Sequence, residues 1–230
     1  MKQLLMNGIE IELERKRIKY MYLRILPPDG RIHISAPVRM KEDEIEAFVF
    51  SKLDWIEKQQ EKMKLYVPVI PLEYKTGEEI MLRGRKYRLQ VAQGYRDNKV
   101  VLVDDRLILT INGDSTPEKR KKIMNDWYRI QLQQEIPPLF WKWERIIGVK
   151  ASGFTIRDMK TRWGTCNLRS KNICLNLQLA KKNPRCLEYV VVHELVHLLE
   201  RSHNYIFKSY MDRFLPDWRD MKSELNDNSF

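Results

Sequence analysis

The histidines of this chain are concentrated in one short stretch. Three of the four lie within 11 positions, at His193, His197 and His203. His193 and His197 are four residues apart, so on an α-helix they lie one turn apart on the same face and can share one metal ion. Glu194 follows the first histidine directly, which gives the His-Glu-x-x-His pattern of zinc hydrolases. We therefore predict a helix with His193 and His197 as metal ligands and with Glu194 as the catalytic base that takes a proton from water.

A third ligand is expected, because catalytic zinc usually has three protein ligands and one open position for water. His203 is the natural choice. A continued helix would carry it roughly 9 Å beyond the second histidine and rotate it away from the ligand face. The spacing therefore predicts that the helix ends between Leu199 and Ser202 and that the chain folds back. Glu200 and Glu224 are the alternative third ligands, since either would give the His, His, Glu set of other zinc peptidases.

Length and composition place the chain among globular proteins with one large or two small domains. It has 230 residues, of which 43% are hydrophobic. No apolar run reaches the ~18 residues of a membrane span, and the first eight residues contain too short an apolar segment for a signal peptide. The three cysteines are odd in number and lack metal-type spacing, so we expect reduced thiols in a cytoplasmic protein at Cys166, Cys174 and Cys186.

The chain is basic, with a formal net charge of +11. Such a charge favours acidic partners, nucleic acid included, through long-range attraction. The basic residues are spread along the whole chain, however, with only short clusters such as 15–17 and 119–122. A solvated basic surface without a dedicated partner is therefore the alternative interpretation.

Residues 1–115 are predicted to form a β-rich N-terminal domain with one helix. Apolar residues with helical spacing predict that helix at 40–65, and no constellation with obvious chemistry occurs in this half. His33 lies in an alternating strand and is interpreted as a structural histidine. Strands are expected as a hairpin or three-stranded meander in the first part and as two hairpins in the second, at 9–14, 19–25, 31–35, 79–82, 86–91, 100–103 and 107–111.

Residues 116–230 are predicted to form the domain that contains the metal site, in an α+β fold. A helix begins after Ser115 or Thr116 and should be kinked or divided at Pro137 and Pro138. Gly164 would let another backbone approach closely. The remaining elements are strands at 154–157 and 172–177, the metal-binding helix from about Pro184 to about Glu200, and helices at 205–214 and 218–225.

Four short motifs of this second half resemble, as a set, the YgjP-type metallopeptidases, which are bacterial and archaeal metal-dependent hydrolases related to the SprT-like zincins. The motifs are Arg162-Trp163-Gly164-Thr165-Cys166, Ile173-x-Leu175-Asn176, Tyr189-Val190-Val191-x-His193-Glu194-Leu195-x-His197 and His203-Asn204-x-x-Phe207. The resemblance implies a zincin-like domain whose small sheet packs on the metal-binding helix. It also implies one zinc ion per chain, ligated by His193, His197 and His203, with Glu194 as acid and base.

The chain departs from this family's pattern at three positions. Thr165 stands where serine is usual, Asn204 where serine is common, and Lys208 where tryptophan is common. None of these departures removes a ligand, and they leave the substrate preference open.

The expected function is hydrolysis of peptide bonds in a peptide or protein substrate. Zinc and one donor would hold the negative charge that develops on the carbonyl oxygen, and Arg201 or Tyr205 could be this donor. A strand near Gly164 could pair with an extended substrate. Two alternatives remain: a DNA-associated protease recruited by the basic surface, as the SprT-like relatives suggest, and a non-catalytic protein in which zinc only stabilises the fold.

Overall fold

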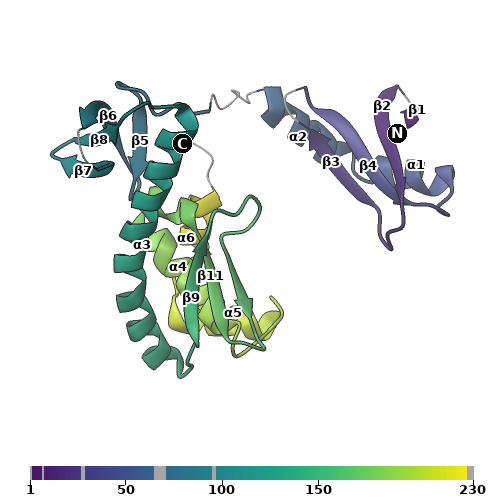
Figure 1. Cartoon of the computed structure of the whole chain (residues 1–230). Coiled ribbons are helices and arrows are strands. Elements are labelled where there is room, and N and C mark those ends of the chain that lie inside the picture. Colours follow the sequence, from purple (N-terminus) through teal and green to yellow (C-terminus); the bar gives the residue numbers. More distant parts are fainter. Residues whose placement is uncertain (1, 7, 27–28, 65–70, 95–96, 227–230) are drawn as a thin grey trace. The chain divides into compact units, whose positions relative to one another are not determined.

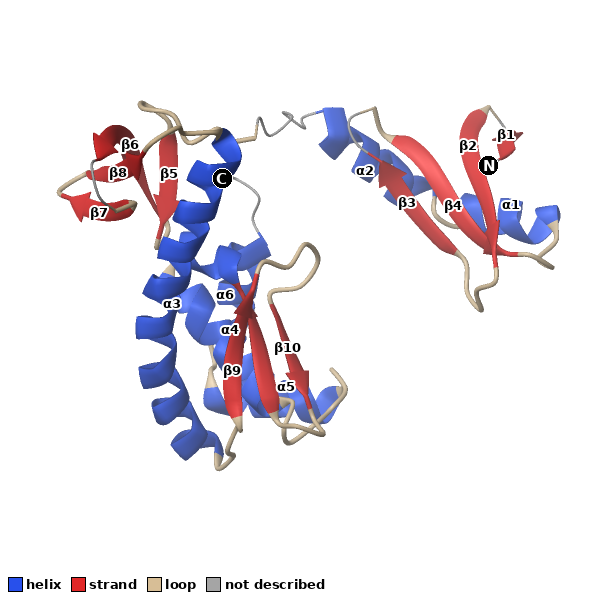
Figure 2. Cartoon of the chain, viewed as in Figure 1, coloured by secondary structure: helices blue, strands red, loops and turns tan. Residues whose placement is uncertain are grey.

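The computed structural model contains two compact units, Met1–Pro71 and Leu72–Phe230 (Figure 1). Both units combine helices with small sheets, so the predicted α+β class is confirmed (Figure 2). None of the described helices has both the length and the apolar character that crossing a membrane requires. The three cysteines are free thiols. The structure describes residues 2–6, 8–26, 29–64, 71–94 and 97–226.

The first unit is built on a four-stranded sheet with the order β1-β2-β4-β3. Strand β4 lies antiparallel to β3, which confirms a hairpin there, and parallel to β2, so the alternative of a three-stranded meander is wrong. Ile32 and Ile34 of β4 are almost fully buried, which suits a central position, whereas β3 has no buried residue and lies at an edge. The strands are β1 (Lys2–Met6), β2 (Ile9–Lys16), β3 (Tyr22–Leu26) and β4 (Arg31–Pro37).

Two helices replace the single helix that was predicted over 40–65. They are α1 (Glu42–Phe50) and α2 (Leu53–Lys64). The break lies at Ser51, whose hydroxyl donates a 2.7 Å hydrogen bond to the carbonyl of Phe48 and so competes with the helical pattern. The apolar periodicity continues through the break, with Ile56 of α2 buried in the same core as α1, and therefore does not reveal it.

A second four-stranded sheet, with the order β5-β6-β8-β7, opens the second unit. The two predicted hairpins are confirmed, because β5 pairs with β6 and β7 with β8, both antiparallel. A parallel pairing of β6 with β8 joins them into one sheet. The strands are β5 (Glu79–Leu82), β6 (Arg85–Gly94), β7 (Lys99–Val103) and β8 (Arg106–Asn112).

Helix α3 (Pro117–Ile147) is continuous through Pro137 and Pro138, so the prolines do not divide it, which was one of the two expected effects. Thr116 caps its start by accepting a hydrogen bond from the backbone N–H of Lys119 at 3.2 Å, and Gly148 ends it with a left-handed φ of 79°. One buried stripe extends along the helix on both sides of the prolines, which explains why it stays intact: Met124, Tyr128, Leu132, Ile136, Phe140, Trp143 and Ile147.

The remaining elements lie around α3 and form the surroundings of the histidines (Figure 1). A three-stranded sheet has the order β10-β11-β9, with β10 at one edge, antiparallel to β11. The elements are β9 (Gly153–Arg157), β10 (Gly164–Asn167), β11 (Asn172–Asn176), the 3-10 helix η1 (Leu177–Lys181), α4 (Pro184–Val196), α5 (Tyr205–Phe214) and α6 (Trp218–Asn226).

The division between the two units falls at residue 71, whereas the sequence suggested a boundary near residue 115. Residues of β5 to β8 belong to the same hydrophobic core as α3 and α4. The hydroxyl of Tyr128 on α3 donates a 2.6 Å hydrogen bond to the carbonyl of Met81 on β5, and the backbone N–H of Arg83 donates to Ala180 of η1 at 2.9 Å. The second sheet is therefore part of the unit that contains the histidines.

Candidate metal centre

Helix α4 positions two of the predicted ligands and the predicted base. Its first turn is fixed by Asn183, whose side chain accepts a hydrogen bond from the backbone N–H of Arg185 at 3.2 Å, with Pro184 at the first helical position. The helix packs against α3, α5, α6 and β10, and most of its residues are buried. This burial fixes the helix rotation and presents His193 and Glu194 to the same cavity.

The helix ends at Val196, before the predicted end near Glu200, and His197 is its C-cap. The backbone N–H groups of Leu198 and Leu199 bond to carbonyls three residues earlier, at 3.0 and 2.9 Å, which is the tighter 3-10 spacing. The chain therefore tightens directly after the second histidine, and the last turn closes with a 3.0 Å bond from the backbone N–H of Glu200 to the carbonyl of Val196. Both leucines continue the apolar pattern, so the sequence does not indicate this early end.

The turn after α4 folds back and brings His203 to the other two histidines. Asn204 caps the next helix, α5, by accepting a hydrogen bond from the backbone N–H of Phe207 at 3.0 Å, which fixes the chain directly after His203. The Nε2 atoms of His203 and His193 are 2.9 Å apart, and the nearest ring nitrogens of the three histidines, with His197, lie within 4.8 Å of one another. Two nitrogens that share a tetrahedral zinc at ~2.0–2.1 Å are about 3.3 Å apart, which is close to this arrangement.

The Nδ1 atoms of His193 and His197 both have a neighbour, and the one at His197 leaves the opposite ring nitrogen free for a metal. Nδ1 of His197 donates to the backbone carbonyl of Glu200 at 3.1 Å, and because a carbonyl only accepts, Nε2 of this ring keeps its lone pair. Nδ1 of His193 lies 3.5 Å from the hydroxyl of Tyr189, one turn earlier on α4. Such outer partners orient ligand imidazoles and fix their tautomers.

The ring of Phe207 forms an apolar floor beneath the three imidazoles. Its centroid lies 4.9 Å from that of His193 and 4.8 Å from those of His197 and His203, and its side chain is buried. Burial, and then the neighbouring histidines, lowers the pKa of His193 to about 3, and burial also lowers the pKa of His197. Both imidazoles are therefore neutral at physiological pH, which is the form that binds metals.

Glu194 points into the cavity without a hydrogen-bond partner for one carboxylate oxygen. Its Oε2 is buried and unpaired, and its residue is only 4% exposed. Burial raises the pKa of this carboxyl to about 8, against the opposing influence of Arg162. An added Cβ at Gly164 would lie 2.6 Å from Glu194 Oε1 and 2.9 Å from Val190 Cγ1. The sequence predicted a close approach of backbone to Gly164, whereas the structure shows that the side chain of Glu194 occupies this space.

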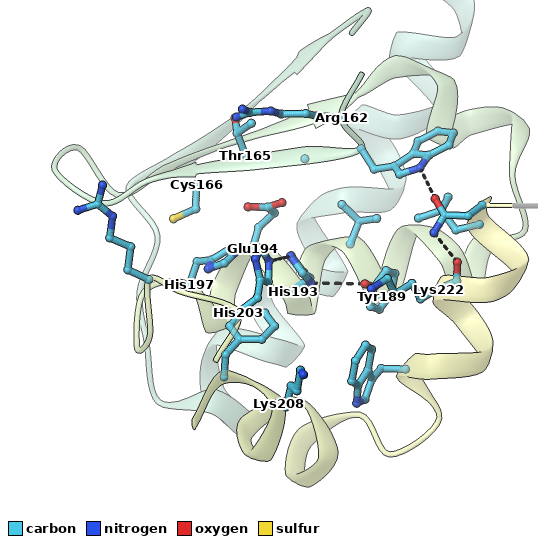
Figure 3. A pocket seen from close by; sticks show the side chains of 18 of the residues that line it. Arg162, Thr165, Cys166, Tyr189, His193, Glu194, His197, His203, Lys208 and Lys222 are labelled. Carbon is cyan, nitrogen blue, oxygen red and sulfur yellow. Dashed lines mark hydrogen bonds between the residues drawn. The ribbon is translucent and has the colours of Figure 1, made fainter. Parts of the chain in front are cut away.

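A cavity of about 830 Å³ opens over the three histidines and Glu194 (Figure 3). Gly164 and Arg201 line it, as the sequence suggested for residues near the substrate. Tyr205, the other suggested oxyanion donor, is 84% exposed and is not among the lining residues. The remaining lining is mixed, with aromatic side chains and several cations.

The two alternative third ligands are engaged elsewhere. The carboxylate of Glu200 accepts a 2.9 Å hydrogen bond from the backbone N–H of Ser202 within the turn. Glu224 pairs with Arg185 at 3.6 Å on the first turn of α4. Among the described residues, the group whose donor atoms could hold a metal ion here consists of His193, His197 and His203.

Asn176 supports the site, although the sequence analysis gave it no role. Its side-chain amide donates to the carbonyls of Met159 and Arg162 at 2.8 and 2.7 Å, and its backbone N–H donates to the carbonyl of Trp163 at 2.9 Å. These bonds hold the loop that leads into Gly164. Asn176 occurs in one of the motifs that carry the family resemblance, and this motif is the feature of the sequence that marks it as a candidate supporting residue. Tyr189 was likewise identifiable by its four-residue spacing from His193.

The donor set fits a divalent metal ion. Three imidazoles converge, and Glu194 lies beside them with an unpaired buried oxygen that is available to a water molecule. The Nδ1 atom of His197 donates to a carbonyl and so leaves Nε2 available, and the ring of Phe207 packs against the imidazoles. These are the properties of a three-ligand site with room for a further, non-protein ligand.

Comparisons with known proteins identify the family of the chain. The sequence model of the YgjP-like metallopeptidase domain matches residues 19–228. No curated protein matches the chain. Two similar solved structures are metallopeptidase zymogens, abylysin of Pyrococcus abyssi and jannalysin of Methanocaldococcus jannaschii, each 18% identical. The TM-scores are 0.36 and 0.35, the matches cover 38% and 40% of this chain, and they cover 89% and 87% of those chains. With a family match over nearly its whole length, the chain belongs to the YgjP-like metallopeptidases and is a metal-dependent hydrolase.

Proposed function

We propose that the protein is a zinc-dependent peptidase that binds one zinc ion through His193, His197 and His203. The observation that carries the proposal is the convergence of three imidazoles beside Glu194, a carboxylate with an unpaired buried oxygen. Neutral imidazole is a preferred zinc ligand, and three such ligands leave a coordination position open. When bound, zinc would act as a Lewis acid that lowers the pKa of a water molecule from ~15.7 towards ~7.

Glu194 would act as the general base and then as the general acid. It accepts the proton of the attacking water as a bond forms to the peptide carbonyl carbon, and it passes this proton to the leaving amine nitrogen as the C–N bond breaks. Gly164 provides the space in which the carboxylate lies. Of the two suggested donors for the developing oxyanion, Arg201 is favoured over Tyr205, because Arg201 lines the cavity.

Strand β10 would bind the substrate backbone. It lies at an edge of its sheet, pairs with β11 on one side, and contributes Gly164, Thr165 and Cys166 to the cavity lining. An extended peptide could add to this edge through main-chain hydrogen bonds and so place a carbonyl beside Glu194.

The decisive experiment compares the wild type with Glu194→Gln for metal content and for cleavage of unfolded protein substrates. We expect the variant to retain zinc and to lose most of its turnover, because the amide cannot accept the proton. Glu118→Gln, which makes the same change on the exposed first turn of α3, is the matched control and should leave activity unchanged. Full activity in Glu194→Gln would remove Glu194 from this role.

Two alternatives remain testable. One is a DNA-associated protease recruited by the net charge of +11, and a salt-dependent shift of labelled DNA would support it. A structural zinc normally has four protein ligands. Within the described part of the chain three histidines form the group, and this favours catalysis over a purely structural ion. Undiminished zinc binding in His203→Ala would show that the third ligand lies elsewhere.

A further inference from the structure

Four cationic side chains line the same cavity as the histidines: Arg162, Arg201, Lys208 and Lys222. They come from four different parts of the chain, which are the loop before β10, the turn between α4 and α5, helix α5 and helix α6. Figure 3 shows Arg162 and Lys208 on opposite sides of Glu194. An ordinary solvated helix presents its charges on one face of a single element. Here cations from four elements converge on one cavity instead.

These four cations outnumber the carboxylates near them, because Arg162 acts on the buried carboxyl of Glu194 and the described cavity lining contains no other acidic residue. No ion pair joins any of them to an aspartate or glutamate there, and Lys222 instead lies 5.8 Å from the ring of Trp218. Glu194 is the acidic residue of the lining, and it is buried. Some cations elsewhere in this unit are paired, for example Lys142 with Glu188 at 2.7 Å, but those cations do not converge on a cavity. The cavity therefore presents excess positive charge, to which a divalent metal ion would add.

We propose that this cleft selects peptide segments with acidic residues flanking the cleaved bond. The proposal rests on the peptidase function given above and defines its substrate class. Carboxylates of the substrate would supply the missing counter-charges for Arg162, Lys208 and Lys222. Lysine or arginine at the same substrate positions would be repelled, so the specificity has an attractive and a repulsive part.

A peptide fits these observations better than a nucleic acid does. Nucleic-acid binding commonly relies on 6–10 phosphate contacts along an extended basic track. Here the four cations are gathered around one cavity that also contains the candidate metal ligands and the aromatic side chains of Trp163 and Trp218. Aromatic walls of this kind can contact the aliphatic parts of an extended peptide.

Binding can be measured separately from cleavage by using the zinc-loaded Glu194→Gln protein. Three fluorescent peptides of equal length would carry aspartate, asparagine or lysine at the positions that flank the central bond, with fluorescence anisotropy as the readout. We expect the aspartate peptide to bind about tenfold more tightly than the asparagine peptide, since several exposed charge pairs contribute together. The preference should shrink in high salt, because the Debye length falls from about 10 Å at 0.1 M to about 3 Å at 1 M.

Two double variants of the Glu194→Gln protein test whether the cavity cations cause the preference for aspartate. Lys208→Glu with Lys222→Glu reverses two cavity charges and should abolish the preference for aspartate. Lys121→Glu with Lys122→Glu makes the same change in net charge on exposed positions of α3 outside the cavity lining, and it should retain the preference. Equal loss in both double variants, or equal affinity for the aspartate and asparagine peptides, would overturn the proposal.

A fourth probe, a single-stranded oligonucleotide, distinguishes the other class of ligand. If it binds more tightly than the aspartate peptide and loses affinity in the Lys208→Glu, Lys222→Glu variant, the cations bind a nucleic acid and the proposal is wrong.

Cleavage by the wild type is measured independently. A wild type that cleaves nothing would count against the peptidase function, whereas the binding preference would still decide the class of ligand.

Discussion

Gly164 has no side chain, and this leaves the space that the carboxylate of Glu194 occupies. A Cβ atom at this position would lie only 2.6 Å from Oε1 of Glu194 and 2.9 Å from Cγ1 of Val190. The side chain of Glu194 is thus held between α4 and β10. The catalytic role that we propose for Glu194 depends on this glycine as well as on the histidines.

Gly164→Ala should therefore lose most activity while retaining the metal. The added methyl group would push the carboxylate away from its position but would not touch the imidazoles, so zinc content should stay near the wild-type level. Turnover and zinc stoichiometry, measured on the same preparation, test this expectation. An alanine variant with normal turnover would show that Glu194 does not need this space.

The buried carboxyl of Glu194 should also make the stability of the metal-free protein depend on pH. In the folded protein its pKa is about 8, whereas an unfolded glutamate has a pKa near ~4.3. Between these values the folded state keeps a proton that the unfolded chain releases, so the free energy of unfolding falls as pH rises and the loss is complete above about pH 8.

Glu194→Gln removes this titration. With a chelator present, the variant should match the wild type at pH 4 and exceed its free energy of unfolding at pH 8 by on the order of 4 to 5 kcal/mol, since the shift from ~4.3 to about 8 is worth about 1.4 kcal/mol per pKa unit. Urea denaturation at both pH values provides the measurement. The same difference at pH 4 and pH 8 would contradict the expectation.

At the scale of the elements, Asn183 and Asn204 both cap a helix, but we expect only Asn204 to affect the zinc affinity. Asn183 caps α4 far along the helix from the ligands, whereas Asn204 caps α5 directly after His203. Replacing either asparagine with alanine should cost about 1 kcal/mol of stability. Only Asn204→Ala should also weaken zinc binding, because it releases the backbone that holds His203. Competition with a fluorescent chelator measures the affinity, and equal zinc affinity in both variants would refute this role for Asn204.

The ligand arrangement could be predicted from the sequence because it is local. The four-residue spacing of His193 and His197 fixes their common face, and helical geometry requires a turn before His203. The order of the strands in the sheets could not be predicted in this way. The alternation in β2 and β4 marks their buried faces but does not specify their parallel pairing, which joins distant segments. The continuity of α3 through Pro137 likewise depends on a stripe that is buried by other elements.

At the scale of the whole molecule, the second unit should be the smallest piece that holds the metal. A fragment of residues 72–230 should fold and bind zinc, because it contains the complete core that β5 to β8 share with α3 and α4. A fragment of residues 116–230 should not fold, because it exposes the face of α3 on which Tyr128 bonds to Met81. Thermal unfolding and zinc stoichiometry distinguish the two. A stable zinc-binding 116–230 fragment would instead favour the boundary near residue 115.

That boundary was placed where the composition changes at the start of α3. A change in local pattern shows where one type of element ends, but it does not show which elements share a core. The backbone hydrogen bonds from Arg83 and Gly84 to η1 connect positions about a hundred residues apart, at 2.9 and 3.0 Å, and no local signal encodes them.

The two parts of the proposed chemistry have different origins in the chain. The imidazoles, both helix caps and the apolar floor all come from one contiguous segment, 183–207, while the recess for Glu194 is contributed by a separate strand. Grafting this segment alone onto another scaffold should therefore transfer metal binding without hydrolytic activity, because the recess that positions Glu194 would be missing.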